Sequence, residues 1–348
     1  MVLSKQREIV IRLNADHKIG MGHLYRMLRL AKRLKELKYI PVFVMKENEV
    51  SEEIVRSWDC GALFSVNSEL DEEFIIEKYL SKKAKPHLWI YDVLSTKAEW
   101  IRGLKKHFIP VVCFDDLEGG IKEKVLVINS IAGCWQKEED KSSHQNVLTG
   151  PKYAIINTSK NALKNVREKI TKIGVFFGGS DTHGTTLKVA QILKKISQSY
   201  IVNYYLGPQF IFEDKLKNEL DGSKCQNYIY NNVDDLVGEL AQMDLVICGG
   251  GVSLFEMCSV GQIVVAVANE KHEEQTIQYF SSYGACINAG SFHGKINKDI
   301  IKKSIFLNKE QCDKISLTAS DLVDGNGLDR CVMACLNELT TKHKGFNL

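Results

Sequence analysis

The sequence lacks the features of several common protein classes. Only five of its 348 residues are proline, which argues against a long disordered linker. The formal net charge is +3, without the concentrated basic excess that is typical of nucleic-acid binding, so we expect no nucleic-acid partner. No apolar run reaches about 18 residues, no short-period repeat occurs, and the N-terminus has no apolar region of signal-peptide length. We therefore expect a soluble, cytoplasmic protein with no membrane span.

The ten cysteines include no Cys-x-x-Cys pair. A structural zinc site would need closely spaced ligand pairs, and a disulfide scaffold is typical of a much shorter secreted chain. Several of the cysteines lie in apolar runs, as Cys113 and Cys248 do, where a free thiol behaves as a small hydrophobic group. We therefore expect reduced, buried thiols, no metal and no cofactor.

Short apolar runs alternate with longer amphipathic ones, which predicts an α/β protein built around parallel sheets. The clearest helix is predicted at Gly22–Leu37, with apolar residues on one face and basic residues on the other. Two such series, separated by the polar segment Thr158–Arg167, predict two Rossmann-like domains, residues 1–160 and 161–348, with a ligand cleft between them. The predicted strands are 9–13, 40–45, 87–91, 111–114 and 125–128, then 172–177, 201–206, 228–230, 245–248, 263–266 and 286–288.

A glycine-containing turn precedes the first predicted helix. Gly20 and Gly22 would let the backbone approach a ligand, and His23 would lie where the first N–H groups of the helix converge. A lone histidine here would more often bond locally. The nearby Asn14 and Arg26 favour a functional position for an anion or an attacking oxygen.

Two further glycine-rich turns join a strand to a helix in the second half. The first holds Gly178, Gly179 and Ser180, and it is not a Walker A loop because Gly-Lys-Ser/Thr is absent. The second holds Gly250 and Gly251, with Val252 and Ser253 opening the helix. Each could present N–H groups to a phosphate, although one such turn alone is weak evidence. Together with the segment 269–275, which ends at Gln275, they predict a nucleotide-diphosphate pocket in which Glu256 either takes the ribose or acts only as a first-turn acid.

Acidic residues follow two strands of the first half. Asp92, Asp115 and Asp116 could bind sugar hydroxyls or act as a base. Each could equally cap the next helix, and for any one of them capping is the more common role.

Several motifs resemble one known family. They are Arg12 with Ile19-Gly-Met-Gly-His-Leu-Tyr-Arg26, Phe114-Asp-Asp-Leu117, Thr149-Gly-Pro-Lys-Tyr-Ala154, Phe176-Phe-Gly-Gly-Ser-Asp181 and Gly249-Gly-Gly-Val-Ser-Leu-Phe-Glu256. They are similar to those of the UDP-2,4-diacetamido-2,4,6-trideoxy-β-L-altropyranose hydrolases of the pseudaminic acid pathway. The wider group includes spore-coat polysaccharide synthesis proteins and modules fused to CMP-sialic acid synthetases.

The resemblance implies a GT-B fold, with a UDP-sugar held by the second half and no metal. It implies that His23 activates or orients water to release UDP, with Asp92 and Asn14 beside it. Arg12, Gly20, Gly22, Arg26 and Asp115 would then lie on the substrate side. A CMP-sugar synthetase of the same pathway would be a partner.

The chain departs from the family pattern at three places. Asn14 stands where the family hydrolases usually have Asp, Leu94 stands where they have a catalytic Tyr, and the late helix opens with Glu273-Glu-Gln275 in place of acidic-Asn-Gln. The sequence motif that begins at Asp92 resembles that of the modules fused to CMP-sialic acid synthetases more than that of the hydrolases. A hydrolase is the leading interpretation, and a glycosyltransferase in which His23 deprotonates a sugar hydroxyl is the alternative. A nucleotide-sugar-binding partner without activity is the third.

Overall fold

The computed structural model describes residues 7–14, 22–67, 69–93, 95–130, 146–157 and 169–341. The chain divides into two compact units. Unit 1 comprises Met1–Ile155 together with Asn326–Leu348, and unit 2 comprises Ile156–Gly325. Each unit is built on one parallel sheet, so the predicted α/β class is confirmed.

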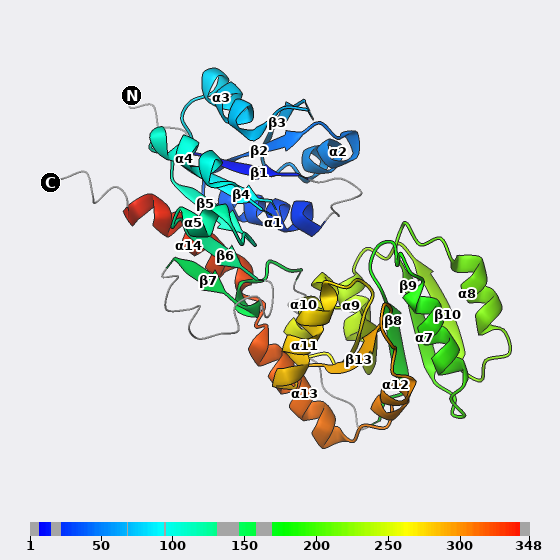
Figure 1. Ribbon diagram of the computed structural model, residues 1–348. Helices are drawn as coiled ribbons and strands as arrows, with labels where there is room; N and C mark the ends of the chain where they lie inside the picture. The colour runs from blue at the N-terminus through cyan, green and yellow to red at the C-terminus, as the bar shows by residue number, and fades with distance from the viewer. Residues whose placement is uncertain are drawn as a thin grey trace. The chain divides into compact units, whose positions relative to one another are not determined.

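Unit 1 contains a seven-stranded sheet in the order β3-β2-β1-β4-β5-β6-β7 (Figure 1). Every strand pairing in it is parallel. The strands are β1 (Glu8–Leu13), β2 (Ile40–Lys46), β3 (Ala62–Val66), β4 (Leu88–Asp92), β5 (Val111–Phe114), β6 (Leu126–Asn129) and β7 (Val147–Thr149). The helices are α1 (Gly22–Glu36), α2 (Glu49–Trp58), α3 (Glu72–Lys82), α4 (Ala98–Lys106), α5 (Gly119–Lys122), the 3₁₀ turn η1 (Pro151–Tyr153) and α14 (Gly327–Thr341).

Unit 2 contains a six-stranded parallel sheet in the order β10-β9-β8-β11-β12-β13. Its strands are β8 (Lys172–Phe176), β9 (Ile201–Leu206), β10 (Gln226–Asn231), β11 (Leu245–Cys248), β12 (Val264–Ala268) and β13 (Ile287–Ser291). Its helices are α7 (Thr185–Lys194), α8 (Glu213–Leu220), α9 (Leu236–Ala241), α10 (Val252–Ser259), α11 (Glu273–Tyr283), α12 (Lys298–Ser304) and α13 (Lys309–Leu322). In both sheets the first strand of the unit lies in the interior, which places the loop after it at a topological switch point, where ligands of such sheets bind.

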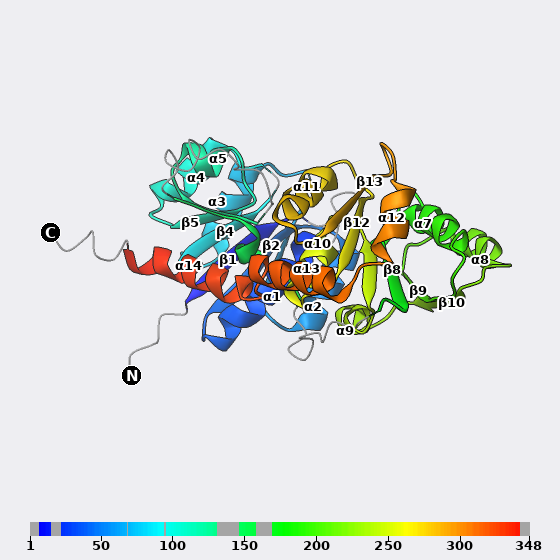
Figure 2. The ribbon, with the colours of Figure 1, turned by 90° about the horizontal axis from the view of Figure 1, so that it is seen from below.

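The predicted division into residues 1–160 and 161–348 is wrong at the C-terminal end. Residues 326–348 belong to unit 1, and Figure 2 shows α14 beside α1. The reason is apolar burial: Cys331, Val332 and Cys335 of α14 lie in the same core cluster as Leu24 and Leu28 of α1. A helix on the last part of a chain can cover a sheet edge built much earlier, and no local pattern records this.

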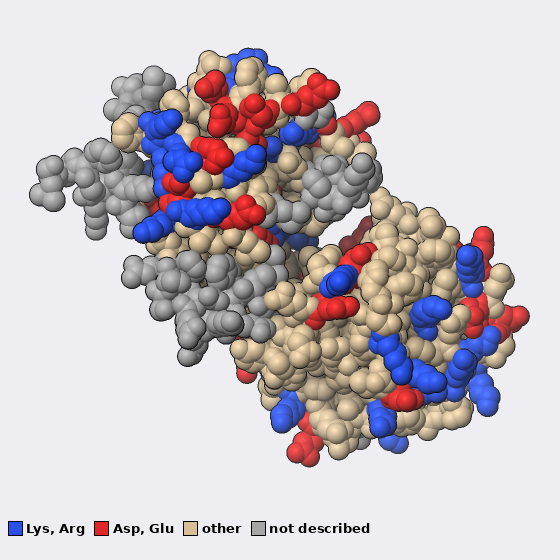
Figure 3. Space-filling model, in the orientation of Figure 1, with Lys and Arg blue, Asp and Glu red and all other residues tan. Residues whose placement is uncertain are grey.

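The remaining expectations concern thiols, charge and membrane segments. The nine cysteines in the described part of the chain are free and buried, as predicted, and Cys134 lies outside it. On the face shown in Figure 3, Lys and Arg side chains are interspersed with Asp and Glu. Among the described residues, no helix is both long enough and apolar enough to span a bilayer.

Candidate functional site

The histidine singled out by the sequence lies at the start of α1. This helix begins at Gly22, and His23 is its second residue. The helix forms because its apolar side chains fall on one face, and that face is fully buried in the unit 1 core. Gly20, predicted on the substrate side, lies outside the described residues, as does Leu94.

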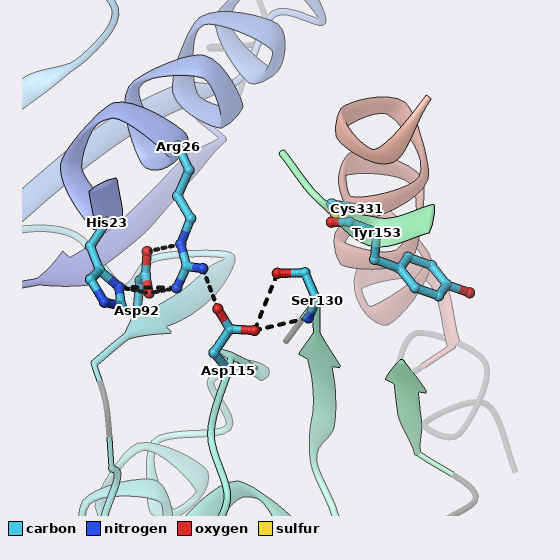
Figure 4. A network of polar contacts seen from close by, with 7 residues as sticks. All are labelled: His23, Arg26, Asp92, Asp115, Ser130, Tyr153 and Cys331. Carbon is cyan, nitrogen blue, oxygen red and sulfur yellow. Dashed lines mark hydrogen bonds and ion pairs between the residues drawn. The ribbon is translucent and has the colours of Figure 1, made fainter. Parts of the chain in front are cut away.

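His23 is held by the aspartate at the end of β4. Its Nδ1 lies 2.8 Å from Oδ1 of Asp92 (Figure 4). The carboxylate can only accept, so in the tautomer with the proton on Nδ1 this nitrogen donates to Asp92, and Nη2 of Arg26, itself a donor, lies 3.0 Å from the same nitrogen. Nε2 is then the basic nitrogen, and it makes no hydrogen bond to any residue in the described part of the chain. The pair has the geometry of an oriented general base.

Arg26, one turn further along α1, links this pair to a second strand end. Its Nε donates to Oδ2 of Asp92 at 2.7 Å, and its Nη2 donates to Oδ1 of the same carboxylate. Its Nη1 donates to Asp115, which follows β5 and also accepts from the Ser130 backbone N–H at 2.9 Å. One cation is therefore shared by two buried carboxylates that the parallel strands bring to one edge of the sheet (Figure 4).

The charges in this network set its protonation. Burial by itself raises the pKa of Asp92, but the charge and hydrogen bonds of Arg26 and the hydrogen bond of His23 outweigh it and lower that pKa below its ordinary value. For Arg26, burial lowers the pKa, whereas Asp115 and Asp92 raise it well above the ordinary value. Asp92 is therefore an ionised acceptor between Arg26 and His23.

Two other predicted residues of unit 1 are directed inward. Arg12 is 1% exposed, and its guanidinium forms a bidentate pair with Glu72, with Nη2 to Oε2 at 2.9 Å. Its Nη1 also donates to the side-chain oxygen of Asn14 at 2.7 Å. Asp116 accepts from the backbone N–H groups of Thr96 and Gly120, which is a local structural role. In this arrangement Arg12 orients Asn14.

In the first glycine-rich turn of unit 2, a carboxylate of the chain itself bonds the start of the following helix. The carboxylate of Asp181 accepts from the N–H of Thr185 at 2.8 Å and from that of Thr186 at 2.9 Å, so it caps the start of α7. Gly178 has a φ of +82°, which glycine adopts without strain. Gly179 has nothing within 4 Å of the position that a Cβ would take, but its carbonyl is already bonded, because it accepts from the Gln209 N–H at 2.9 Å.

The second glycine-rich turn differs because no side chain in the described part of the chain accepts a hydrogen bond from the first N–H groups of its helix. α10 begins at Val252 after the N-cap residue Gly251. Uncapped N–H groups at a helix start are donors available to an anion. Gly250 also has a packing reason to be glycine, since a Cβ there would lie 2.7 Å from Cγ1 of Ile277. A carboxylate oxygen of Glu273 lies 3.1 Å from the position of a Cβ on Gly251.

The other predicted nucleotide contacts lie on the helices beside this turn. Ser253 is in the first turn of α10, and the carboxylate of Glu256 accepts from the backbone N–H of Asn157 at 3.2 Å. Gln275 is exposed in the first turn of α11. The turn at 250–253 and these side chains all lie in unit 2.

Several residues of these sites were not predicted. Ser130 could have been found, because it follows strand β6 at the sheet edge that holds Asp92 and Asp115. Glu72 could not, because 60 residues separate it from Arg12. Cys331 of α14 donates to the carbonyl of Tyr153 at 3.2 Å, and burial and then the Asp115 charge raise its pKa to about 12. The C-terminal helix therefore lies within electrostatic reach of the Arg26 network.

Comparison with known proteins supports homology but no single family. No protein-family model matches the chain. It is 26% identical to the spore coat polysaccharide biosynthesis protein SpsG of Bacillus subtilis over 330 residues, which is 92% of this chain and 95% of that one. It is 27% identical over 319 residues to an uncharacterized protein of Methanocaldococcus jannaschii, covering 88% of this chain but only 63% of that protein. The predicted resemblance to spore-coat polysaccharide proteins is thereby confirmed.

Solved structures give the fold. MurG of Acinetobacter baumannii matches with a TM-score of 0.72 at 11% identity, covering 95% of this chain and 99% of MurG. The calicheamicin glycosyltransferase CalG4 matches with a TM-score of 0.66 at 11% identity, covering 97% of this chain and 99% of CalG4. The chain has a GT-B fold. The predicted fold is therefore confirmed, and at this level of identity the likeness carries the fold alone.

Proposed function

We propose that this chain is an enzyme that acts on a nucleotide sugar in the synthesis of a surface polysaccharide. Its similarity to SpsG, a protein of spore coat polysaccharide biosynthesis, supports the pathway class. The GT-B fold supports a nucleotide-sugar substrate by analogy. The observation that carries the proposal is the hydrogen bond between His23 Nδ1 and Asp92, which leaves Nε2 as a base.

In this proposal the reaction is a displacement at the anomeric carbon. The oxygen of water attacks that carbon while Nε2 of His23 takes the water proton, and the bond between the carbon and the β-phosphate oxygen breaks. UDP leaves with the bonding electron pair. Asp92 stabilises the imidazolium that forms, and Arg26 keeps Asp92 ionised. For the diphosphate we propose the N–H groups at the start of α10 in unit 2 as donors.

A UDP-linked diacetamido-deoxy sugar is the substrate that we propose first, with release of UDP by hydrolysis. The free sugar would then pass toward nonulosonic acid synthesis and a CMP-sugar synthetase. Glycosyl transfer to a sugar hydroxyl is the second candidate, with the same roles for His23 and the nucleotide turn. The specific observation in its favour is Leu94, which offers no hydroxyl where the family hydrolases have Tyr.

The deciding experiment is an incubation with a panel of UDP- and CMP-sugars, with and without glycan acceptors, in which free nucleotide is measured. UDP release without an acceptor supports the hydrolase, and release only with an acceptor supports the transferase. Binding of UDP with no turnover under any condition would contradict both and support a binding protein.

His23→Ala tests the proposed base. We expect kcat to fall by roughly 10²–10⁴-fold, the usual contribution of a general base, because the carboxylates of Asp92 and Asp115 beside it are paired with Arg26. The affinity for UDP, measured by calorimetry, should stay unchanged, since His23 belongs to unit 1 and the glycine turns to unit 2. His107→Ala, at an exposed histidine of the same unit, is the matched control. An unchanged kcat in the His23 variant would remove His23 from the reaction.

A further inference from the structure

Three side chains in unit 2, beside the first glycine-rich turn and in the segment 269–275, bring their ligand atoms together. His183 follows β8, Glu270 follows β12 and His293 follows β13, three strands of one parallel sheet (Figure 1). The nitrogen or oxygen ligand atoms of the three residues all lie within 4.8 Å of one another. The cluster joins loops that are far apart in the sequence, and the sequence did not predict that these three side chains meet.

We propose that His183, Glu270 and His293 form a binding site for a divalent transition-metal ion, with zinc as the ion that fits best. Two imidazoles and one carboxylate are a common set of three protein ligands for Zn²⁺, and they leave a fourth position for water. Two imidazole nitrogens and only one carboxylate argue against Ca²⁺ and Mg²⁺, which prefer oxygen ligands.

The geometry suits such an ion. Zinc binds imidazole nitrogen and carboxylate oxygen at about 2.0–2.2 Å, so two ligands of a tetrahedral site lie roughly 3.4 Å apart. Nε2 of His183 lies 3.5 Å from Oε1 of Glu270, which is already close to that separation. Only the exposed His293 would need a small side-chain adjustment.

Neighbouring groups hold two of the ligands in place. Phe292 stacks on the His183 ring, with ring centroids 4.9 Å apart and planes 18° apart. The hydroxyl of Thr182 donates to Oε1 of Glu270 at 2.6 Å. The His183 and His293 rings are nearly perpendicular, with centroids 4.5 Å apart. Such partners orient metal ligands before the ion arrives.

The site would link the loops after β8, β12 and β13 when the ion is bound. Binding to the folded state alone stabilises a protein by mass action. We therefore expect Zn²⁺ to raise the melting temperature, with no nucleotide or sugar present. This expectation does not depend on the proposed function, because no substrate takes part in it.

The test uses the full chain without a polyhistidine tag, titrated with Zn²⁺ alone by calorimetry and with Co²⁺ alone by visible absorption. We expect one equivalent of metal per chain, and Co²⁺ bands that indicate a four-coordinate nitrogen and oxygen site. Loss of a group that only orients a metal ligand weakens metal affinity roughly 10–100-fold. Loss of a ligand itself should cost at least as much, so we expect this loss of affinity in each of three variants: His183→Ala, Glu270→Gln and His293→Ala.

His293→Ala is the decisive variant, because His293 is exposed and its loss should leave the fold intact. His107→Ala, an exposed histidine in unit 1, is the matched control and should bind metal as the native chain does. Absence of stoichiometric binding, or binding that all three variants retain, would overturn the proposal. In that case the cluster is an ordinary polar contact of His183 with Glu270.

Discussion

At the scale of single residues, the Arg26 network is an arrangement of charges that can be buried only together. Asp92 is 1% exposed, and an isolated carboxylate at such a depth would carry a large desolvation penalty. Arg26 supplies the compensating charge to Asp92 and to Asp115. Removing Asp92 therefore affects two properties: the orientation of His23 and the stability of unit 1.

The pH dependence of the melting temperature of Asp92→Asn shows how much of the stability effect comes from the lost charge. The pKa of Asp92 is lower in the folded chain than in the unfolded chain, where it has the ordinary value of about 3.9. Its charge therefore stabilises the folded state fully at a pH above about 3.9, and this stabilisation is lost as the pH falls through the folded-state pKa. We expect the native chain to melt at a higher temperature than the variant at pH 7, and the gap to narrow below about pH 4.

The control for this measurement is Glu77→Gln, which removes an exposed carboxylate of α3. Its melting temperature should follow that of the native chain at every pH. A gap for Asp92→Asn that stays constant from pH 7 to pH 3 would mean that the loss comes from altered packing and not from the charge.

At the scale of elements, the two glycine turns of unit 2 differ in why they need glycine. Gly250 is packed against Ile277 and the backbone of Glu273, whereas the position that a Cβ on Gly179 would take is open. The sequence presents both as glycine-rich turns between a strand and a helix, and only the packed structure separates them. The same holds for the helices that follow, because Asp181 caps α7, whereas no side chain of the described residues caps α10.

A pair of alanine substitutions tests this difference. Gly250→Ala should lower the free energy of unfolding by about 1–3 kcal/mol, the usual range for overpacking. Gly179→Ala should leave stability within about 0.5 kcal/mol, but weaken UDP binding about tenfold if its backbone contacts the nucleotide. Denaturant unfolding and calorimetry measure the two effects. Equal stability of the two variants would contradict the packing argument, and unchanged UDP affinity in Gly179→Ala would remove that contact.

Elements with strong local patterns were predicted well. The helix expected at Gly22–Leu37 is α1, and the strands 111–114, 201–206 and 245–248 match β5, β9 and β11. β3 and β7 were missed. β3 is a partly exposed strand and β7 is only three residues long, and both lie at the edges of their sheet. Short edge strands carry little hydrophobic periodicity, so the sequence signal there is weak.

At the scale of the whole molecule, the return of α14 to unit 1 is the main departure from the sequence-based prediction. Val332 is 1% exposed in the unit 1 core, whereas the next residue, Met333, is 57% exposed. Val332→Asp should therefore reduce the free energy of unfolding of unit 1 by about 3–5 kcal/mol, the range for an uncompensated buried charge, and its melting temperature should fall accordingly.

Met333→Asp is the matched control, with the same new charge one residue away. It should change stability by no more than about 0.5 kcal/mol, as surface substitutions usually do. Thermal unfolding and limited proteolysis of the full chain measure both variants. If Val332→Asp were as stable as Met333→Asp, α14 would not be part of the unit 1 core.

The sequence by itself determined the α/β class, the two parallel sheets and the place of His23 at a helix start, because these follow from local periodicity and from glycine-rich turns. The tertiary structure decided what depends on contacts across the chain: the bond of His23 to Asp92, the pairing of Arg12 with Glu72 and the return of residues 326–348 to unit 1. It also separated the capped start of α7 from the uncapped start of α10. Local pattern shows which face of an element is apolar, but only packing decides which distant residues meet there.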